Sequence, residues 1–188
     1  MKTLTFIFLV IIPWGAIAQK YTLQVTDVDI NGTSNLHDWT MTSNSAQGEV
    51  GLVIQNFKLV EIEQLHFKIA VKSLKSGKKT MDNICYDALK EEQSPIISFQ
   101  LSEILSIENG TGEYTIKASG WLNIAGVVRL ETITATGSIK SSGIEFTGTH
   151  QIKMTTYKVE PPTALFGTLK TGDKIEVVFR TTFSKPDA

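Results

Sequence analysis

The sequence predicts an all-β fold, namely a closed antiparallel barrel of about eight strands with one amphipathic helix. Three observations support this prediction. Apolar and polar residues alternate along several segments, turn dipeptides separate these segments, and only one segment has helical spacing. The order of elements shows no βαβ alternation, which disfavours a parallel sheet. Hairpin-like spacing favours an up-and-down barrel over a sandwich.

The strands are predicted from two kinds of segment. In the first kind, apolar side chains fall on every second residue, as in Leu65–Val71, Ile97–Leu101 and Ile175–Phe183. The second kind is less regular but rich in Thr, Val and Ile, and covers residues 21–30, 49–54, 114–124, 127–139 and 144–154. Turn dipeptides such as Asn31-Gly32 and Asn109-Gly110 lie between the segments.

The predicted helix covers residues 80–92. Its apolar residues recur at helical spacing: Met81, Ile84, Cys85, Ala88 and Leu89. Pro95 would end any helix and precedes the next strand. Cys85 is the only cysteine, so it forms no internal disulfide, and its place on the apolar stripe predicts a buried, free and unreactive thiol.

The N-terminus predicts export. Lys2 precedes an apolar run over Leu4–Ile12, and Ala16-Ile17-Ala18 has the small residues of a cleavage site. The run is too short to span a bilayer, which needs about 20 residues. We therefore expect residues 1–18 to be a cleaved signal peptide, and residues 19–188 to be one domain in the periplasm or outside the cell.

Composition narrows the function classes. The net charge is −1 and the charges are evenly spread, which argues against a nucleic-acid partner and a polybasic membrane patch. His37, His66 and His150 lack metal-ligand spacing, and no G-x-S-x-G elbow is present. We expect no enzyme activity, no cofactor, no metal and no membrane-spanning segment. The sequence leaves a homodimer open.

An ordered set of motifs resembles the YceI-like family of polyisoprenoid-binding, lipocalin-like proteins, and most closely the branch common in Bacteroidetes-type bacteria. The motifs are residues 32–39, 48–50, 73–77, 81–82, 88–90, 95–99, 120–127 and 161–173. The resemblance implies an extended barrel with a hydrophobic channel, export to the periplasm, and a long isoprenoid or similar ligand. Two positions depart from better-known members. Met81-Asp82 replaces an Arg-Asp pair, and residues 86–89 replace a doubled Phe.

The candidate ligand-binding residues are apolar and mostly aromatic: Trp39, Phe67, Ile69, Phe99, Leu101, Trp121, Phe146, Phe166 and Phe179. In a filled barrel the same residues would be core, and pattern alone does not separate the two readings. Together with the resemblance, the pattern favours binding of an isoprenoid, quinone-like or fatty amphiphile. The alternative is a filled barrel that acts as a structural or protein-interaction module in an envelope stress response.

Two further segments carry open alternatives. His37-Asp38-Trp39 either contacts a ligand head group at the barrel mouth or fixes a strand bend through hydrogen bonds to the backbone. Leu165-Phe166, after the stiff Pro161-Pro162 pair, forms either a lid or a plug. The free energy of binding favours a long ligand, because each buried methylene contributes about 0.8 kcal/mol against an association cost of about 4–15 kcal/mol.

Overall fold

A computed structural model describes residues 18–141, 143–164 and 167–185 of the chain. Within these residues the elements are β1 (Gln19–Ser34), β2 (Trp39–Ser43), β3 (Gln47–Gln55), β4 (Lys58–Ala70), a 3-10 turn (Val71–Ser73), α1 (Lys79–Ala88), β5 (Ile96–Asn109), β6 (Tyr114–Ile124), β7 (Val127–Lys140), β8 (Gly143–Lys153), a second 3-10 turn (Met154–Tyr157), β9 (Thr163–Ala164) and β10 (Leu169–Ser184). The predicted signal peptide and the Leu165-Phe166 pair lie outside the described residues, Ala18 excepted.

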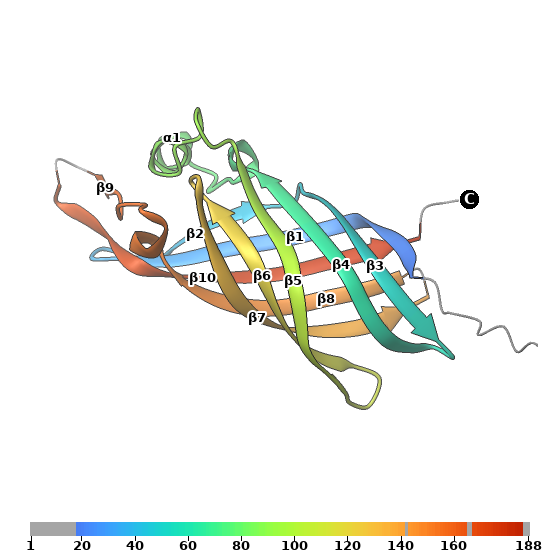
Figure 1. The fold of residues 1–188 in the computed structure, drawn as a ribbon. Coiled ribbons are helices and arrows are strands. Elements are labelled where there is room, and N and C mark those ends of the chain that lie inside the picture. The colour runs from blue at the N-terminus through green and yellow to red at the C-terminus, as the bar shows by residue number, and fades with distance from the viewer. Residues whose placement is uncertain (1–17, 142, 165–166, 186–188) are drawn as a thin grey trace, which may run out of the picture.

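The strands form a closed antiparallel barrel, as the sequence predicted (Figure 1). Neighbours pair in the order β1-β3-β4-β5-β6-β7-β8-β10, and β10 pairs back with β1, which closes the ring of eight strands. β2 runs beside the second half of β1, and β9 pairs with the start of β10. Each of the eight strands therefore has a neighbour on both sides, although β4 and β5 pair only over His66–Ala70 and Ile96–Gln100.

The period-2 pattern of β10 points its apolar residues into the barrel. Ile175, Val177 and Phe179 face the interior together with Thr181 and Phe183. The same holds for Leu65, Phe67 and Ile69 of β4 and for Ile97, Phe99 and Leu101 of β5. Val71, predicted as the last residue of the β4 segment, lies instead in the 3-10 turn that follows β4. The alternation that predicted these strands therefore also predicted which face lies inside.

A dense core closes the end of the barrel that lies away from α1. Its buried members are Tyr21, Val50, Leu52, Leu59, Ile62, Tyr114, Ile116, Ile144, Phe146 and Phe183. The rings of Phe146 and Phe183 meet edge to face with centroids 5.9 Å apart. The buried hydroxyl of Tyr114 accepts a hydrogen bond from the Leu59 N–H at 3.0 Å.

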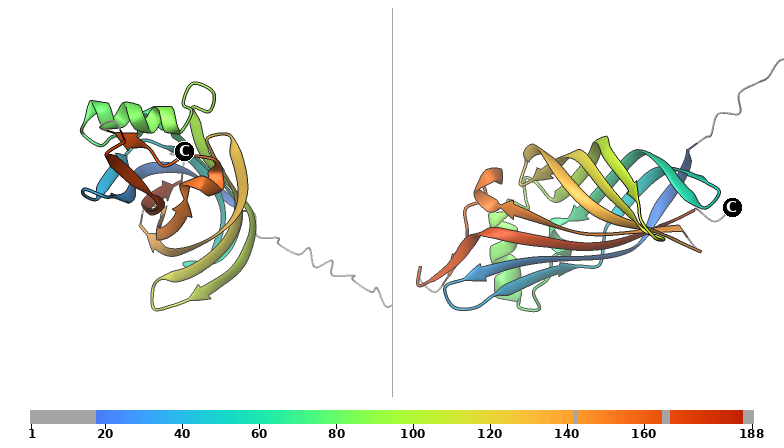
Figure 2. Two further views of the ribbon diagram at one scale, coloured as in Figure 1. Left: turned by 90° about the vertical axis from the view of Figure 1, so that its left-hand side faces the viewer. Right: turned by 90° about the horizontal axis from the view of Figure 1, so that it is seen from below.

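The single helix of the described chain, α1, lies across the other end of the barrel (Figure 2). It ends at Ala88, four residues before the predicted boundary, which was therefore wrong. Lys90 adopts the left-handed conformation, and the Glu91 N–H donates to the Tyr86 carbonyl at 3.0 Å. This Schellman arrangement ends the helix before Pro95 is reached. No described helix is both long and apolar enough to cross a bilayer.

Candidate ligand-binding cavity

The barrel encloses a cavity of about 720 Å³ that reaches from the closed-end core to α1. Its wall is almost entirely apolar, and the described residues contribute no aspartate or glutamate to it. The described lysine and histidine side chains on it are His37, Lys78 and His150. Such a volume and lining are typical of small-molecule sites. The interior is therefore not filled by side chains, which contradicts the filled-barrel reading of the core.

The cavity wall contains most of the predicted site residues. Those that line it are Trp39, Phe67, Ile69, Phe99, Leu101, Phe146 and Phe179. Phe166 lies outside the described residues. Ligand contact at these seven positions stays a prediction, whereas their place on the wall is a property of the fold.

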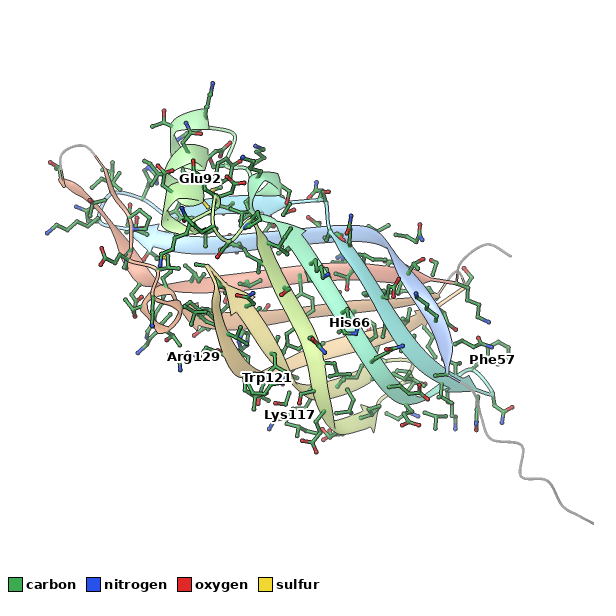
Figure 3. All side chains as sticks on the ribbon, turned by 45° about the horizontal axis from the view of Figure 1, so that its top comes forward. Phe57, His66, Glu92, Lys117, Trp121 and Arg129 are labelled. Atoms are coloured by element: carbon green, nitrogen blue, oxygen red, sulfur yellow. The ribbon has the colours of Figure 1, made fainter. Side chains whose placement is uncertain are left out.

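Trp121 does not line the cavity, so its assignment to the channel was wrong. Its side chain is 48% exposed on the outer face of β6, opposite the exposed Leu130 of β7 (Figure 3). The parity of the strand explains this, because Ile116 and Leu122 face inward and an odd-numbered neighbour must face outward. The position of Trp121 in the alternation therefore predicts the orientation of its side chain better than the apolar character of that side chain does.

Three of the aromatic rings lie over glycines of a neighbouring strand, namely Trp39 over Gly32, Phe99 over Gly120 and Phe179 over Gly148. A Cβ atom at Gly120 would lie 2.3 Å from Cζ of Phe99, and one at Gly148 would lie 2.5 Å from Cζ of Phe179. Any larger residue at either glycine would push the ring inward. The glycines therefore let both rings lie close to the barrel wall, which leaves space in the centre.

α1 covers the open end of the cavity with its apolar stripe. The stripe predicted from helical spacing lines the cavity in full: Met81, Ile84, Cys85, Ala88 and Leu89. Burial, and secondarily the nearby charge of Asp82, raises the pKa of the Cys85 thiol to about 12. The thiol therefore stays protonated at neutral pH.

Hydrogen bonds fasten α1 to the loop before it. The carboxylate of Asp82, which is 8% exposed, accepts bonds from the backbone N–H and the hydroxyl of Ser76, both at 2.7 Å. These two bonds lower the pKa of Asp82. The hydroxyl of Tyr86 lies 2.9 Å from the Leu74 carbonyl and accepts from Lys75 Nζ at 2.6 Å. Sequence reasoning noted Asp82 and Tyr86 only in the comparison with the family pattern and missed this role.

The mouth beside α1 carries most of the polar lining. His37, Lys78, Thr80 and Thr163 lie on this part of the wall, next to Pro162. These side chains supply hydrogen-bond donors and one fixed positive charge. An amphiphile that fills the apolar interior would therefore meet its polar partners at this end.

The His37-Asp38-Trp39 segment makes the predicted hydrogen bonds to the backbone, and its contact with a ligand head group stays a prediction. The Ser34 hydroxyl accepts from the His37 N–H at 3.1 Å, and His37 Nδ1 lies 2.8 Å from the Asp38 carbonyl. The indole of Trp39 donates to the Thr33 carbonyl at 3.1 Å. These bonds fix the turn between β1 and β2, while His37 and Trp39 also line the cavity.

A polar cluster lies where the β7–β8 ladder ends. Ladder pairing stops at Ala135 and Gly148. Beyond it, Glu131 accepts from the hydroxyl of the fully buried Tyr157 at 2.7 Å and meets His150 Nε2 at 3.3 Å. Burial, with added help from the Glu131 carboxylate, raises the pKa of Tyr157. The partners are far apart in sequence, and no local motif marked them.

The described residues offer no group of three or more His, Cys, Asp or Glu side chains placed to hold a metal ion. His66, expected on the polar face of its strand, is exposed there (Figure 3). What the site can do physically is to bury a long apolar chain and hold a polar group at the mouth.

Several solved structures share this architecture. BcnA of Burkholderia cenocepacia superposes with a TM-score of 0.64 at 18% identity, over 83% of this chain and 94% of its own. A polyisoprenoid binding domain from Saccharophagus degradans implicated in plant cell wall breakdown gives 0.67 at 13% identity, over 88% and 98%. The YceI protein of Campylobacter jejuni gives 0.54 at 21% identity, over 74% and 82%. No curated protein matches the chain.

The fold and the cavity define a lipocalin-like barrel of the kind that holds apolar ligands. The YceI-like domain model matches residues 18–183, so the chain belongs to the YceI-like family. This confirms the family inferred from the ordered motifs.

Proposed function

We propose that this protein binds a long single-chain amphiphile in its barrel and carries or sequesters it in the periplasm or outside the cell. The observation that carries the proposal is the apolar cavity of about 720 Å³ beneath α1. The Saccharophagus degradans structure, described as a polyisoprenoid binding domain, supports an isoprenoid as one candidate ligand. A quinone-like or fatty chain would fit the same apolar cavity. The ordered motifs also support placement in the Bacteroidetes-type branch.

The cavity volume sets the scale of the ligand. Liquid water occupies about 30 Å³ per molecule and a methylene group is of similar size, so the cavity has room for on the order of 20 such groups. Their burial would contribute roughly 16 kcal/mol, which exceeds an association cost of about 4–15 kcal/mol. Chains much shorter than this would bind weakly.

Mass spectrometry tests the proposal directly. The protein is purified without detergent from its native host, and native spectra are searched for a mass above that of the polypeptide. A matched pair of variants on β7 provides the control. Ala135→Phe places a ring in the cavity, whereas Thr134→Phe places one on the outer face. We expect Ala135→Phe to lose the ligand and Thr134→Phe to keep it.

A wild-type protein that retains no lipid, and binds no added long-chain probe, would overturn the proposal. Export is tested in the same preparation. The N-terminal motif supports cleavage after Ala18, so the purified chain should begin at Gln19. An intact Met1 in the membrane fraction would contradict export by cleavage.

A further inference from the structure

The ladder between β4 and β5 covers only one end of these strands. His66–Ala70 pair with Ile96–Gln100, and no pairing joins the two strands beyond His66 and Gln100. Figure 1 shows β4 and β5 diverging below this paired end. The pairing of β5 with β6 shifts register between Leu101 and Glu103 and again between Ile104 and Ser106. Such bulges bend a strand, which accounts for the separation.

A second cavity of about 470 Å³ lies in this separation, and we name it the β4–β5 slot. It is lined by Val60, Glu61, Ile62, Glu63, Leu101, Ser102, Glu103, Ile104 and Ile107. Ile62, Leu101 and Ile104 line the main cavity as well. The same three apolar side chains therefore form a wall of both spaces, away from the mouth beside α1.

The two spaces carry charges of opposite sign. Among the described residues, the slot is lined by three carboxylates, those of Glu61, Glu63 and Glu103, and by no lysine or arginine. In the same part of the chain, the main cavity has Lys78 on its lining and no carboxylate. An anionic head group is therefore favoured near the α1 mouth and disfavoured at the slot.

We propose that the β4–β5 slot is a second opening of the binding tunnel, through which the tail of a ligand longer than the enclosed cavity leaves the barrel. This rests on the proposed function. It narrows the ligand class to single-chain amphiphiles that exceed about 20 methylene groups, with the head group at the α1 mouth. Bulges and carboxylates are features that block pairing with a foreign strand, so the unpaired edges favour a lipid tail over a docked peptide.

Chain-length dependence of affinity tests the slot. The probes are straight-chain carboxylic acids of about 12 to about 30 carbons, which bracket the estimated capacity. Val60→Trp and Ser102→Trp, combined in one variant, add bulk at positions that line the slot and not the main cavity. Thr132→Trp, on the exposed face of β7, is the matched control.

We expect the slot variant to lose about tenfold in affinity for the longest acids and to stay within about twofold of wild type for the shortest. A tenfold loss corresponds to about 1.4 kcal/mol, roughly the contribution of two buried methylene groups. The control should follow wild type at every length. An equal loss at all lengths, or no loss at any, would overturn the slot. Denaturant unfolding of each variant shows whether a uniform loss comes from poor folding.

Photocrosslinking gives an independent readout. A 30-carbon acid, about ten carbons beyond the estimated capacity, carries a diazirine at its far end and is irradiated on the wild-type protein. We expect crosslinks at residues that line the slot and not the main cavity, namely Val60, Glu61, Glu63, Ser102 and Glu103. Crosslinks only at the closed-end core or at the α1 mouth would overturn the slot while leaving the carrier function intact. Wild-type protein that binds no chain of any length would overturn both.

Discussion

The ring of Phe179 lies over Gly148 on the neighbouring strand, so close that a Cβ atom there would be 2.5 Å from Cζ of the ring. The backbone carbonyl oxygen of Thr134 would lie 3.0 Å from the same added Cβ atom. No side chain fits at Gly148 without moving one of these groups. The ring is the more mobile of the two, and the open side of the ring is the cavity.

Gly148→Ala should therefore shrink the cavity. We expect the Phe179 ring to turn inward, with a loss of about 1–3 kcal/mol in the free energy of unfolding and a clear drop in affinity for a long-chain probe. Thr149→Ala, on the exposed face of the same strand, should change neither quantity. The double variant Gly148→Ala/Phe179→Leu should recover part of both. If the double variant binds no better than Gly148→Ala, the ring is not what blocks the cavity.

Truncating the half-buried phenylalanines of the cavity wall should destabilise the protein less than truncating those of the closed-end core. Phe67, Phe99 and Phe179 border the cavity, so truncation to alanine removes fewer packed neighbours there. Phe183, 1% exposed, packs against Phe146, and its truncation should cost about 3–5 kcal/mol.

Denaturant unfolding without lipid and retention of a long-chain quinone separate the two groups. We expect the three wall variants to lose the ligand with modest destabilisation. The main effect of Phe183→Ala should instead be a loss in the free energy of unfolding. Core-sized destabilisation at all three wall positions, with no ligand retained by wild type, would overturn the carrier function.

The alternation of apolar and polar residues within single strands predicted much of this site. Period 2 placed Phe67, Phe99 and Phe179 inside because their segments are regular. Helical spacing likewise identified the stripe of α1. The same rule, applied to the irregular segment around Trp121, would have placed that residue outside. Trp121 was instead grouped with the other aromatic candidates for the channel, which was wrong.

Other features depend on contacts between distant parts of the chain. Glu131 meets Tyr157 and His150 only because the β7–β8 ladder ends between them. The β4–β5 slot depends on two bulges whose positions are set by pairing with β6. The end of α1 at Ala88 depends on the left-handed conformation of Lys90, a residue with no special preference for it. No local pattern in the sequence marks any of the three.

Removing the Asp82 carboxylate should loosen the loop that carries Lys78. Asp82→Asn keeps the shape of the side chain but weakens two charge-assisted bonds to Ser76, so we expect a loss of about 1 kcal/mol in the free energy of unfolding. Asp87→Asn, an exposed carboxylate on the same helix, is the control. Equal stability of both variants would show that Asp82 does not hold α1.

The same carboxylate gives a pH dependence of defined sign. The hydrogen bonds from Ser76 lower the pKa of Asp82 below its ordinary value of 3.8, so its charged form stabilises the folded state. The stabilisation is complete above pH 3.8 and is lost as the pH falls through the lowered pKa. The stability difference between wild type and Asp82→Asn should therefore be constant near neutral pH and shrink in strong acid. A difference that persists unchanged in acid would assign the effect to packing.

Cys85 provides a probe of the cavity that needs no mutation. Its thiol lines the cavity beneath α1, and burial raises its pKa to about 12. A thiol reagent attacks the thiolate, so labelling of the folded protein at about pH 8 should be slow, and unfolding should make it fast, since an exposed cysteine has a pKa near 8.5. A long-chain ligand should slow the labelling of the folded protein further by occupying the space next to Sγ. Rapid labelling in native buffer, or a disulfide-linked dimer on a non-reducing gel, would show that α1 does not cover the cavity in solution.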